Sequence, residues 1–557
     1  MFINPFTAPP EEVQPEFHNP EWLEQAIFYE IYPQSFYDTN GDGIGDLEGV
    51  IEKLDYVSSL GADAIWLNPC FESPFSDAGY DISDFYKVAP RYGTNADLKR
   101  LFAEARKRGI RVVLDLVAGH TSVECEWFKQ SARHERNAYS DWFIWSNNIW
   151  AQTPPGSRHQ FIAGTAERNG GYLPNFFPFQ PALNYGFANP DPDLPWQQPV
   201  DAPGPKAVRA ELKKIMKFWL DMGASGYRVD MAASLVKDDP GSRATIELWR
   251  EMRAWLDRDY PEAVLISEWG RPERAIKAGF HIDFYLGGRF GNGYTSLFRK
   301  QYARGFGGGG QGFSFFDAEG LGNIMDFVNE YSPRLKATQK AGYICIFSGN
   351  HDTSPRLGMN RTFQDLGVAF TFLLTIPGVP KIYYGDEIGM LGVPGLPSKE
   401  GSYWRTEART PMQWDHTQNA GFSSASADKI YLPIEADLGS RTVADQEKDH
   451  LSLLNAIRAL CQMRREHPAL GNRGDFQVVY AQPGRYPFAY LRQGGGERIL
   501  VAVNPAGHPV EVDLPAEALT GSLDAPKVLW GVEEGLKRTP QGWKISLPAV
   551  RTGVYQL

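Results

Sequence analysis

The stretch Ala207-Val-Arg-Ala-Glu-Leu-Lys-Lys-Ile-Met-Lys-Phe-Trp-Leu-Asp-Met222, followed closely by Gly226-Tyr-Arg-Val-Asp230, decides the fold of this chain. In the first segment the apolar residues recur at helical spacing: Val208, Leu212, Ile215, Met216 and Trp219. The second segment is a short run that does not alternate with polar residues, which is typical of a strand buried on both faces. A helix that leads into a buried strand is the repeating unit of an α/β fold.

Runs like the second segment recur along the chain from about residue 26 to 390. They cover residues 27–35, 64–68, 111–117, 226–230, 264–269, 282–286, 344–350 and 380–385. Segments with helical periodicity, such as residues 95–108, lie between them. Eight strand-then-helix units predict an α/β fold of the (β/α)₈ type, a TIM barrel.

Two parts of the 557 residues depart from this pattern. About a hundred residues separate the third run from the fourth, where a plain βα unit needs about 30. We therefore expect an inserted domain B over residues 121–204, on the third strand's loop, with the barrel formed by residues 1–120 and 205–470. After residue 470 short strand-like runs alternate with Gly/Pro turns, which predicts a C-terminal antiparallel β-sandwich over residues 471–557.

Composition argues against several classes of function. The formal net charge is −11, so we expect no nucleic-acid partner, because such proteins carry a basic face. No apolar stretch reaches 18 residues, so we expect no membrane helix. The first 20 residues lack a basic-then-apolar signal pattern, which favours a cytoplasmic location. The four cysteines show no CxxC spacing and are interpreted as free thiols.

Polar and charged residues follow four of the predicted strands. In a TIM barrel the active site lies at the carboxyl ends of the strands. The residues found there are Asp115 and His120 on the third strand, Arg228 and Asp230 on the fourth, Glu268 on the fifth, and His351 and Asp352 on the seventh. One such acid could be a structural ion pair, but four strands converging on one rim predict a catalytic site.

Asp230 and Glu268 end neighbouring strands, which lie roughly 5 Å apart in a sheet. Two carboxyl groups about 5–5.5 Å apart are what a retaining glycoside hydrolase needs. Arg228 lies two residues before Asp230, on the same strand face, and its charge would keep Asp230 ionised as a nucleophile. Glu268 would then be the proton donor.

These strand ends resemble the signature regions of the α-amylase superfamily, glycoside hydrolase family thirteen. The matching elements are Asp115…Gly119-His120, Gly226-Tyr-Arg228-Val-Asp230, Ile266-Ser-Glu268 and Asn350-His351-Asp352. The resemblance implies that Asp230 is the nucleophile, Glu268 the general acid/base, and Asp352 the residue that grips the sugar. It also implies that Tyr80 stacks on that sugar and that His120 and His351 bind its hydroxyl groups.

Two further segments resemble the oligo-1,6-glucosidase and trehalose synthase branch of the family. They are Gln180-Pro-Ala-Leu-Asn184 and Arg409-Thr-Pro-Met-Gln-Trp-Asp415 with Asn419-Ala-Gly-Phe422. In exo-acting relatives the counterparts of Asp81 and Arg409 close the pocket around a terminal glucose. The resemblance therefore implies an exo-acting enzyme, although Asp81 and Arg409 could also form a structural ion pair.

Two metal predictions follow. Gly119 stands where many α-amylases carry a calcium-binding Asn, so the resemblance makes a calcium ion between barrel and insert doubtful. The segment Asp38-Thr-Asn40-Gly-Asp42-Gly-Ile44-Gly-Asp46 places oxygen-bearing groups on alternate residues around glycines, as a hard cation requires. We predict structural Ca²⁺ or Mg²⁺ at Asp38, Asn40, Asp42, Ile44 and Asp46, with a plain polar turn as the alternative and no organic cofactor.

The sequence thus predicts a retaining α-glycoside hydrolase that trims short α-linked gluco-oligosaccharides, resembling an α-glucosidase. A transglycosidase or isomerase such as a trehalose synthase is the first alternative, since the same residues serve both reactions. An endo-acting α-amylase is the second. A non-catalytic sugar-binding or partner protein is disfavoured, because the carboxylates are all present. The sequence does not predict an oligomeric state.

Overall fold

Eight parallel strands close into a barrel in which each strand hydrogen-bonds its two neighbours, in the order β1-β10-β9-β8-β7-β6-β5-β2. The structure is a computed structural model of the chain that describes residues 10–146, 148–150, 160–164, 166–286, 293–300, 312–400, 405–519 and 526–557. The barrel strands are β1 (Phe28–Ile31), β2 (Ala64–Leu67), β5 (Arg111–Leu116), β6 (Gly226–Val229), β7 (Val264–Ser267), β8 (Ile282–Phe284), β9 (Tyr343–Phe347) and β10 (Val379–Tyr383). The predicted TIM barrel is confirmed.

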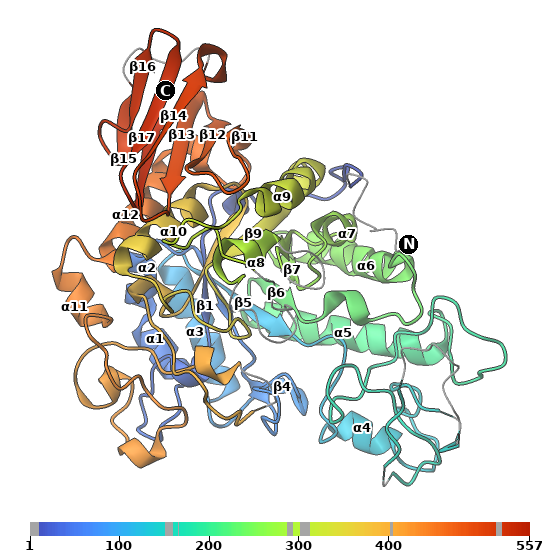
Figure 1. Cartoon of the computed structure of the whole chain (residues 1–557). Coiled ribbons are helices and arrows are strands. Elements are labelled where there is room, and N and C mark those ends of the chain that lie inside the picture. The colour runs from blue at the N-terminus through green and yellow to red at the C-terminus, as the bar shows by residue number, and fades with distance from the viewer. Residues whose placement is uncertain are drawn as a thin grey trace.

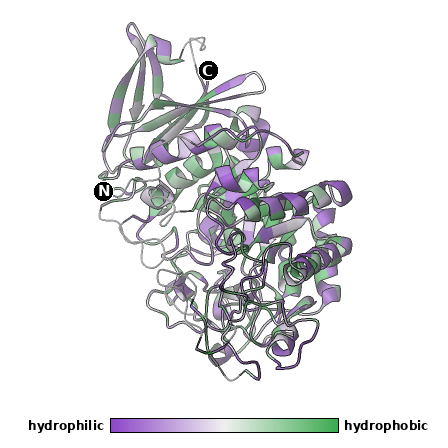
Figure 2. Ribbon diagram, turned by 90° about the vertical axis from the view of Figure 1, so that its right-hand side faces the viewer, coloured by the Kyte–Doolittle hydropathy of each residue, from purple (hydrophilic) through white to green (hydrophobic). Residues whose placement is uncertain are grey.

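Helices surround the barrel (Figure 1). They include α1 (Leu47–Glu52), α2 (Leu54–Ser59), α3 (Asn95–Lys107), α5 (Pro203–Met222), α6 (Arg243–Asp259), α7 (Pro272–Lys277), α8 (Gly293–Phe298), α9 (Met325–Thr338), α10 (Phe363–Thr375), α11 (Val443–Lys448) and α12 (Leu453–Glu466). A capping box of Thr94 and Asp97 starts α3. Hydrophobic residues gather inside these layers while hydrophilic ones face outward (Figure 2), as amphipathic helices require.

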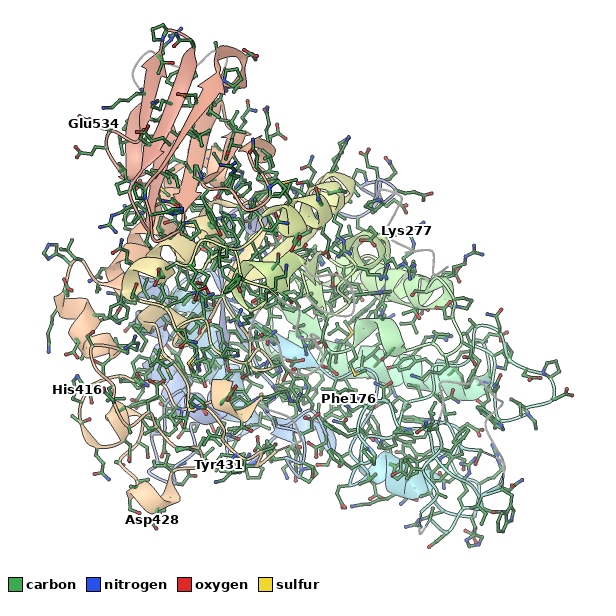
Figure 3. The ribbon with its side chains drawn as sticks, viewed as in Figure 1. Phe176, Lys277, His416, Asp428, Tyr431 and Glu534 are labelled. Atoms are coloured by element: carbon green, nitrogen blue, oxygen red, sulfur yellow. The ribbon has the colours of Figure 1, made fainter. Side chains whose placement is uncertain are left out.

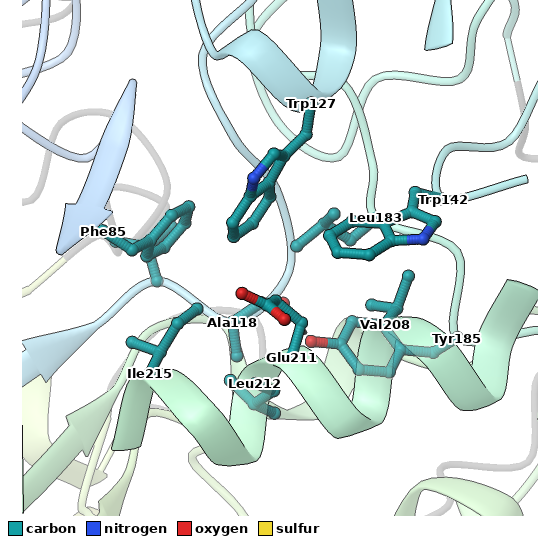
Figure 4. Close-up of a pocket in the computed structure, with 11 residues that line it drawn as sticks. Phe85, Ala118, Trp127, Trp142, Leu183, Tyr185, Val208, Glu211, Leu212 and Ile215 are labelled. Carbon is teal, nitrogen blue, oxygen red and sulfur yellow. Dashed lines mark hydrogen bonds between the residues drawn. The ribbon is translucent and has the colours of Figure 1, made fainter. Parts of the chain in front are cut away.

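The insert between β5 and α5 contains α4 (Glu126–Ser131) and is otherwise built largely of turns and isolated β-bridges. It packs on the barrel through aromatic rings: Trp127 stacks on Phe85 at 5.3 Å and meets Trp142 edge-on at 5.1 Å. These rings and the apolar face of α5 enclose a small pocket into which Glu211 projects (Figure 4). The contact with Phe85 places the insert next to the small sheet of β3 (Phe71–Glu72) and β4 (Asp84–Val88), and the bridge between His120 and Ala182 joins it to the chain just beyond the carboxyl end of β5.

The C-terminal region forms two antiparallel sheets, as predicted. The larger contains β11 (Asp475–Tyr480), β12 (Phe488–Gly494), β13 (Glu497–Asn504), β18 (Arg551–Gln556) and β15 (Lys527–Gly531), and the smaller contains β14 (Val510–Pro515), β17 (Gly542–Leu547) and β16 (Leu536–Thr539). All four cysteines are buried free thiols, as expected. Within the described ranges, we find no helix with the length and apolar character to cross a membrane.

Candidate active site

The two predicted catalytic carboxyl groups leave neighbouring strands side by side. In the parallel register, Val229 of β6 pairs with Ser267 of β7, so the next residues, Asp230 and Glu268, face each other beyond the strand ends. The backbone ladder continues there, because the Glu268 N–H donates to the Val229 carbonyl at 3.1 Å. Neighbouring strands are about 5 Å apart, so this register suits the spacing of a retaining pair.

A single guanidinium connects the acids of three strands. Arg228 Nη1 lies 2.9 Å from Asp115 Oδ1 and 3.0 Å from Asp230 Oδ1, and Nη2 lies 2.9 Å from Glu268 Oε2. The side chain of Arg228 is 3% exposed, so these ion pairs are poorly screened by water. Glu268 also accepts the Met231 N–H at 2.9 Å, and Met231 adopts a left-handed φ of 44°. Arg228 therefore holds both carboxyl groups in place.

The pKa of Asp230 is raised well above its ordinary value. Burial is the largest cause and the neighbouring Glu268 carboxyl is the next, while Arg228 acts in the opposite direction. The expectation that Arg228 keeps Asp230 ionised is therefore wrong, because burial and the neighbouring carboxyl group outweigh the guanidinium. A retaining mechanism needs one proton on this pair, carried by the acid that protonates the leaving oxygen.

Asp352 lies among cations. Its Oδ1 is 3.0 Å from Arg405 Nη1 and 2.7 Å from Arg409 Nη2, and its Oδ2 is 3.6 Å from His351 Nε2. Burial raises the pKa of Asp352, but His351, Arg405 and Arg409 outweigh it and hold that pKa far below its ordinary value. The side chain is nevertheless 37% exposed. Asp352 is thus an ionised, accessible acceptor for hydroxyl groups.

The alternative interpretation, an ion pair between Asp81 and Arg409, is wrong. Asp81 is fully buried, and its carboxylate accepts from Ser73 Oγ at 3.0 Å and from the backbone N–H groups of residues 76 and 77. It therefore shapes its own loop. Arg409 instead donates to Asp352 and, at 2.7 Å, to the His351 carbonyl.

The aspartate of this loop that pairs with an arginine of the site is Asp77. Its Oδ1 lies 2.8 Å from Arg405 Nη2, and its Oδ2 accepts from Gln180 Nε2 of the insert at 2.8 Å. Arg405 thereby bridges Asp77 and Asp352, and its guanidinium lies 6.0 Å from the ring of Phe177. Neither Asp77 nor Arg405 was predicted from the sequence. The segment Asp77-Ala-Gly-Tyr80-Asp81 offers two aspartates, and spacing alone does not tell which faces the site.

Tyr80 and His120 are both buried at the predicted end of the barrel. The Tyr80 hydroxyl lies 2.9 Å from Asp115 Oδ2 and 2.8 Å from His351 Nε2, and its ring stacks on that of His351 at 5.3 Å. His120 Nε2 is 3.1 Å from the Tyr80 carbonyl, and burial lowers the pKa of His120 to about 4, so its imidazole is neutral near pH 7. The Tyr80 ring thus lies beside Arg228, and His120 contacts the Tyr80 backbone, so the two rings form one wall of the site.

Asn175 and Lys237 lie between this wall and the insert. Asn175 Nδ2 is 3.2 Å from His120 Nδ1, and its Oδ1 accepts from Lys237 Nζ at 3.1 Å. A Cβ atom on residue 119 would come within 2.7 Å of the Asn175 amide nitrogen. Any larger residue than glycine would therefore displace this amide. Figure 3 labels the next residue, Phe176, where the insert meets the barrel.

Comparison with known proteins identifies the family. A family model described as "Alpha amylase, catalytic domain" matches residues 30–473, and one described as "Maltogenic Amylase, C-terminal domain" matches residues 476–550. The chain belongs to the α-amylase family. This membership agrees with the barrel, the insert and the C-terminal sheets described above. It also indicates an enzyme that acts on α-glucosides.

Several α-amylase family relatives match most of this chain. An oligo-1,6-glucosidase of Heyndrickxia coagulans is 30% identical over 89% of this chain and 94% of its own. A trehalose synthase/amylase of Mycobacterium tuberculosis is 32% identical over 92% of this chain and 88% of its own. Solved structures of a trehalulose synthase from Pseudomonas mesoacidophila and an isomaltulose synthase from Klebsiella are each 28% identical, with TM-scores of 0.77, and cover 97% of this chain and 100% of their own.

Proposed function

We propose that this protein is an exo-acting α-glucosidase that hydrolyses short α-linked gluco-oligosaccharides with retention of configuration. The observation that carries the proposal is the ion-pair group of Arg228 with Asp230 and Glu268, whose register suits a nucleophile beside an acid. Asp352, ionised and accessible, supplies the acceptor for the hydroxyl groups of the terminal glucose.

The Asp77–Arg405 ion pair supports exo action. Arg405 spans Asp77 and Asp352 with bonds of 2.8 and 3.0 Å, and all three side chains lie beside the predicted sugar site. A guanidinium fixed there by two carboxylates would limit the depth of the pocket to one sugar unit. We therefore propose that Asp77 and Arg405 close the sugar pocket, the role that the sequence suggested for Asp81 and Arg409.

The proposed reaction has two steps. Glu268 donates its proton to the glycosidic oxygen as the Asp230 carboxylate attacks the anomeric carbon, so the leaving sugar departs with that proton and a β-glucosyl ester forms. Glu268 then removes a proton from water, which attacks the ester carbon and releases α-glucose and the Asp230 carboxylate. Arg228 remains bound to both acids, which keeps them aligned through both steps.

A transglycosidase or isomerase is the second candidate, and the relatives favour it specifically. The trehalose synthase/amylase and the trehalulose and isomaltulose synthases match this chain as extensively as the oligo-1,6-glucosidase does. A variant of the trehalulose synthase has been solved with its substrate sucrose. In such a reaction a sugar hydroxyl replaces water in the second step, and the residues of the first step are unchanged.

Product analysis separates these candidates. Maltose, isomaltose, sucrose, trehalose and maltotriose are incubated with the enzyme while NMR follows the anomeric protons. We expect α-glucose as the first product from at least one disaccharide. A new disaccharide with little free glucose would establish transfer, and internal cleavage of long starch chains would establish an endo-amylase. Asp230→Asn should lower kcat at least about a thousandfold, and a variant with full activity on every sugar would contradict the catalytic assignment.

We also propose that residues 38–46 hold a structural Ca²⁺ or Mg²⁺ ion. The donor chemistry suits a hard cation: the carboxylates of Asp38, Asp42 and Asp46, the Asn40 amide oxygen and the Ile44 carbonyl. Asp38 and Asp46 accept hydrogen bonds from backbone N–H groups of this segment and its neighbour Gly49. Among the residues that the structure describes, no three His, Cys, Asp or Glu side chains lie close enough together to hold a metal ion. Binding would therefore exchange some of these hydrogen bonds for metal contacts.

A further inference from the structure

His351 is enclosed by polar groups from several elements. Its Nδ1 lies 2.9 Å from Glu30 Oε1 of β1, and its Nε2 lies 2.8 Å from the Tyr80 hydroxyl and 3.6 Å from Asp352 Oδ2. The side chain is 1% exposed, so water does not compete for these contacts. The protonation and orientation of this imidazole are consequently set by its neighbours.

The neighbours of Nδ1 are both acceptors. Glu30 offers a carboxylate oxygen, and Asn68, with its amide oxygen turned toward the ring, accepts from Nδ1 at 3.1 Å while its nitrogen donates to Glu30 Oε1 at 3.2 Å. This amide orientation satisfies both ends of Asn68, which is the basis for choosing it. Nδ1 therefore carries a proton, because a bare nitrogen there would face only acceptors.

Lys381 keeps Glu30 ionised. Its Nζ forms an ion pair with Glu30 Oε2 inside the barrel and donates to the Gly349 carbonyl at 2.7 Å. Both side chains are essentially inaccessible. Burial raises the pKa of Glu30, but Lys381 and His351 outweigh burial and hold that pKa below its ordinary value.

A buried ion pair is weak support for stability, because removing two charges from water costs about as much as their attraction returns. Glu30 and Lys381 occupy neighbouring strands of the barrel interior, where apolar residues would pack without that cost. What distinguishes Glu30 from an ordinary ion-pair partner is its second bond, which ends on the imidazole beside Asp352.

We propose that Glu30, held by Lys381, is a positioning residue that acts through His351: it fixes the proton on Nδ1 and aims Nε2 at Tyr80 and Asp352. The inference rests on the proposed function, in which His351 and Asp352 bind the terminal glucose. The other charged groups around the ring are Asp115 and Arg228, which reach it through Tyr80, and Arg409, which binds the His351 carbonyl.

The test uses the double variant Glu30→Gln/Lys381→Met. It removes both charges together, so neither is left buried without a partner, and glutamine keeps the shape of Glu30. The matched control is Glu387→Gln. Glu387 is also fully buried beside β10, and its Oε1 accepts from Tyr29 and Tyr56 hydroxyls at 2.7 Å without touching His351.

We expect the double variant to remain folded by circular dichroism and to lose about 10- to 100-fold in kcat/KM on the best disaccharide, with a changed pH profile. Glu387→Gln should stay within about twofold. Wild-type kcat/KM and an unchanged pH profile in the folded double variant would overturn the proposal.

A second measurement does not depend on activity or on the variant folding. In ¹⁵N-histidine-labelled wild-type protein, the His351 signal, assigned by its loss in His351→Asn, should show a proton on Nδ1 across pH 5–9. An Nε2-only tautomer would overturn the proposal. Inactivity of the wild type on every sugar would instead refute the proposed function and leave the tautomer result standing.

Discussion

At the scale of single residues, the candidate site depends on a few guanidinium groups that each connect carboxylates from different strands or loops. Arg228 joins the acids of β5, β6 and β7, and Arg405 joins Asp77 to Asp352. A planar guanidinium donates in several fixed directions, which a lysine does not. These arginines therefore determine the distances between the acids as well as their charge.

The distinction between Asp77 and Asp81 gives a prediction at this scale. Arg405→Ala leaves the nearly buried Asp77 without its cation and opens the end of the pocket. Breaking a buried charge pair costs about 2 kcal/mol or more, so kcat/KM on disaccharides should fall at least about 30-fold. Steady-state kinetics on maltose and maltotriose measure this loss.

Asp81→Asn is the comparison. Asp81 accepts hydrogen bonds from its own loop, so this substitution should lower the melting temperature. The KM for disaccharides should stay close to that of the wild type. The opposite result would be an Asp81→Asn enzyme that keeps its stability but loses disaccharide affinity, together with an Arg405→Ala enzyme of normal activity. That result would return the role of closing the pocket to Asp81, as the sequence resemblance implies.

Much of the site was accessible from the sequence, for a physical reason. Asp230, Glu268 and Asp352 follow strands directly, and the carboxyl ends of parallel strands must meet at one end of the barrel. Asp77, Gln180 and Asn175 lie on irregular loops, where no periodicity tells which way a side chain points. Glu30 and Lys381 lie inside apolar strands that are far apart in the sequence. The sequence pattern therefore does not indicate that the two side chains form an ion pair.

At the scale of elements, prediction succeeded where burial imposes a pattern. All eight barrel runs were found because strands covered on both faces are continuously apolar. The C-terminal strands were predicted only as a group, because segments such as β15 (Lys527–Gly531) and β16 (Leu536–Thr539) mix charged and apolar residues and have few fully buried positions. The insert itself was predicted, but its internal structure was not, since it is packed through rings such as Trp127 and Trp142 and contains few regular elements.

The loop of residues 38–46 provides a prediction at the scale of an element. If it binds a cation, millimolar Ca²⁺ should raise the melting temperature by a few degrees over the value in EDTA, because a ligand that binds only the folded state stabilises it. Asp42→Asn should remove most of this difference, since asparagine keeps the turn but loses a charge. Differential scanning fluorimetry measures the shift.

The control is Asp437→Asn, an exposed aspartate that makes the same kind of turn bond to Gly439 at 3.0 Å. It should respond to calcium as the wild type does. Equal melting temperatures of the wild type in Ca²⁺, Mg²⁺ and EDTA would show that residues 38–46 form a plain polar turn.

At the scale of the whole molecule, two buried arginines bind carbonyls where the C-terminal sheets meet the barrel: Arg492 reaches from the sheets to the barrel, and Arg464 lies within the barrel region. Arg492 of β12 donates to the Thr375 carbonyl at the end of α10 and to Gly471 at 2.6 Å. Arg464 of α12 donates to Leu374 at 2.7 Å and to Gly378 at 2.8 Å. Figure 1 shows these sheets next to α10 and α12, away from the insert. The two arginines satisfy the free carbonyls where α10 ends and β10 begins.

Arg492→Met should accordingly destabilise the attachment of the C-terminal sheets while leaving the distant site intact. Each buried carbonyl left without a donor costs about 1–3 kcal/mol, so the loss should reach several kcal/mol and lower the melting temperature by several degrees. Scanning calorimetry should show the C-terminal sheets unfolding earlier than the barrel, whereas kcat on the best disaccharide stays within about twofold below that transition. Lys537→Met serves as the control, because its ion pair with Glu534 is exposed to water and contributes little to stability. A melting temperature of Arg492→Met equal to that of Lys537→Met would mean that the sheets are held to the barrel mainly by apolar contacts such as Phe315 with Tyr486.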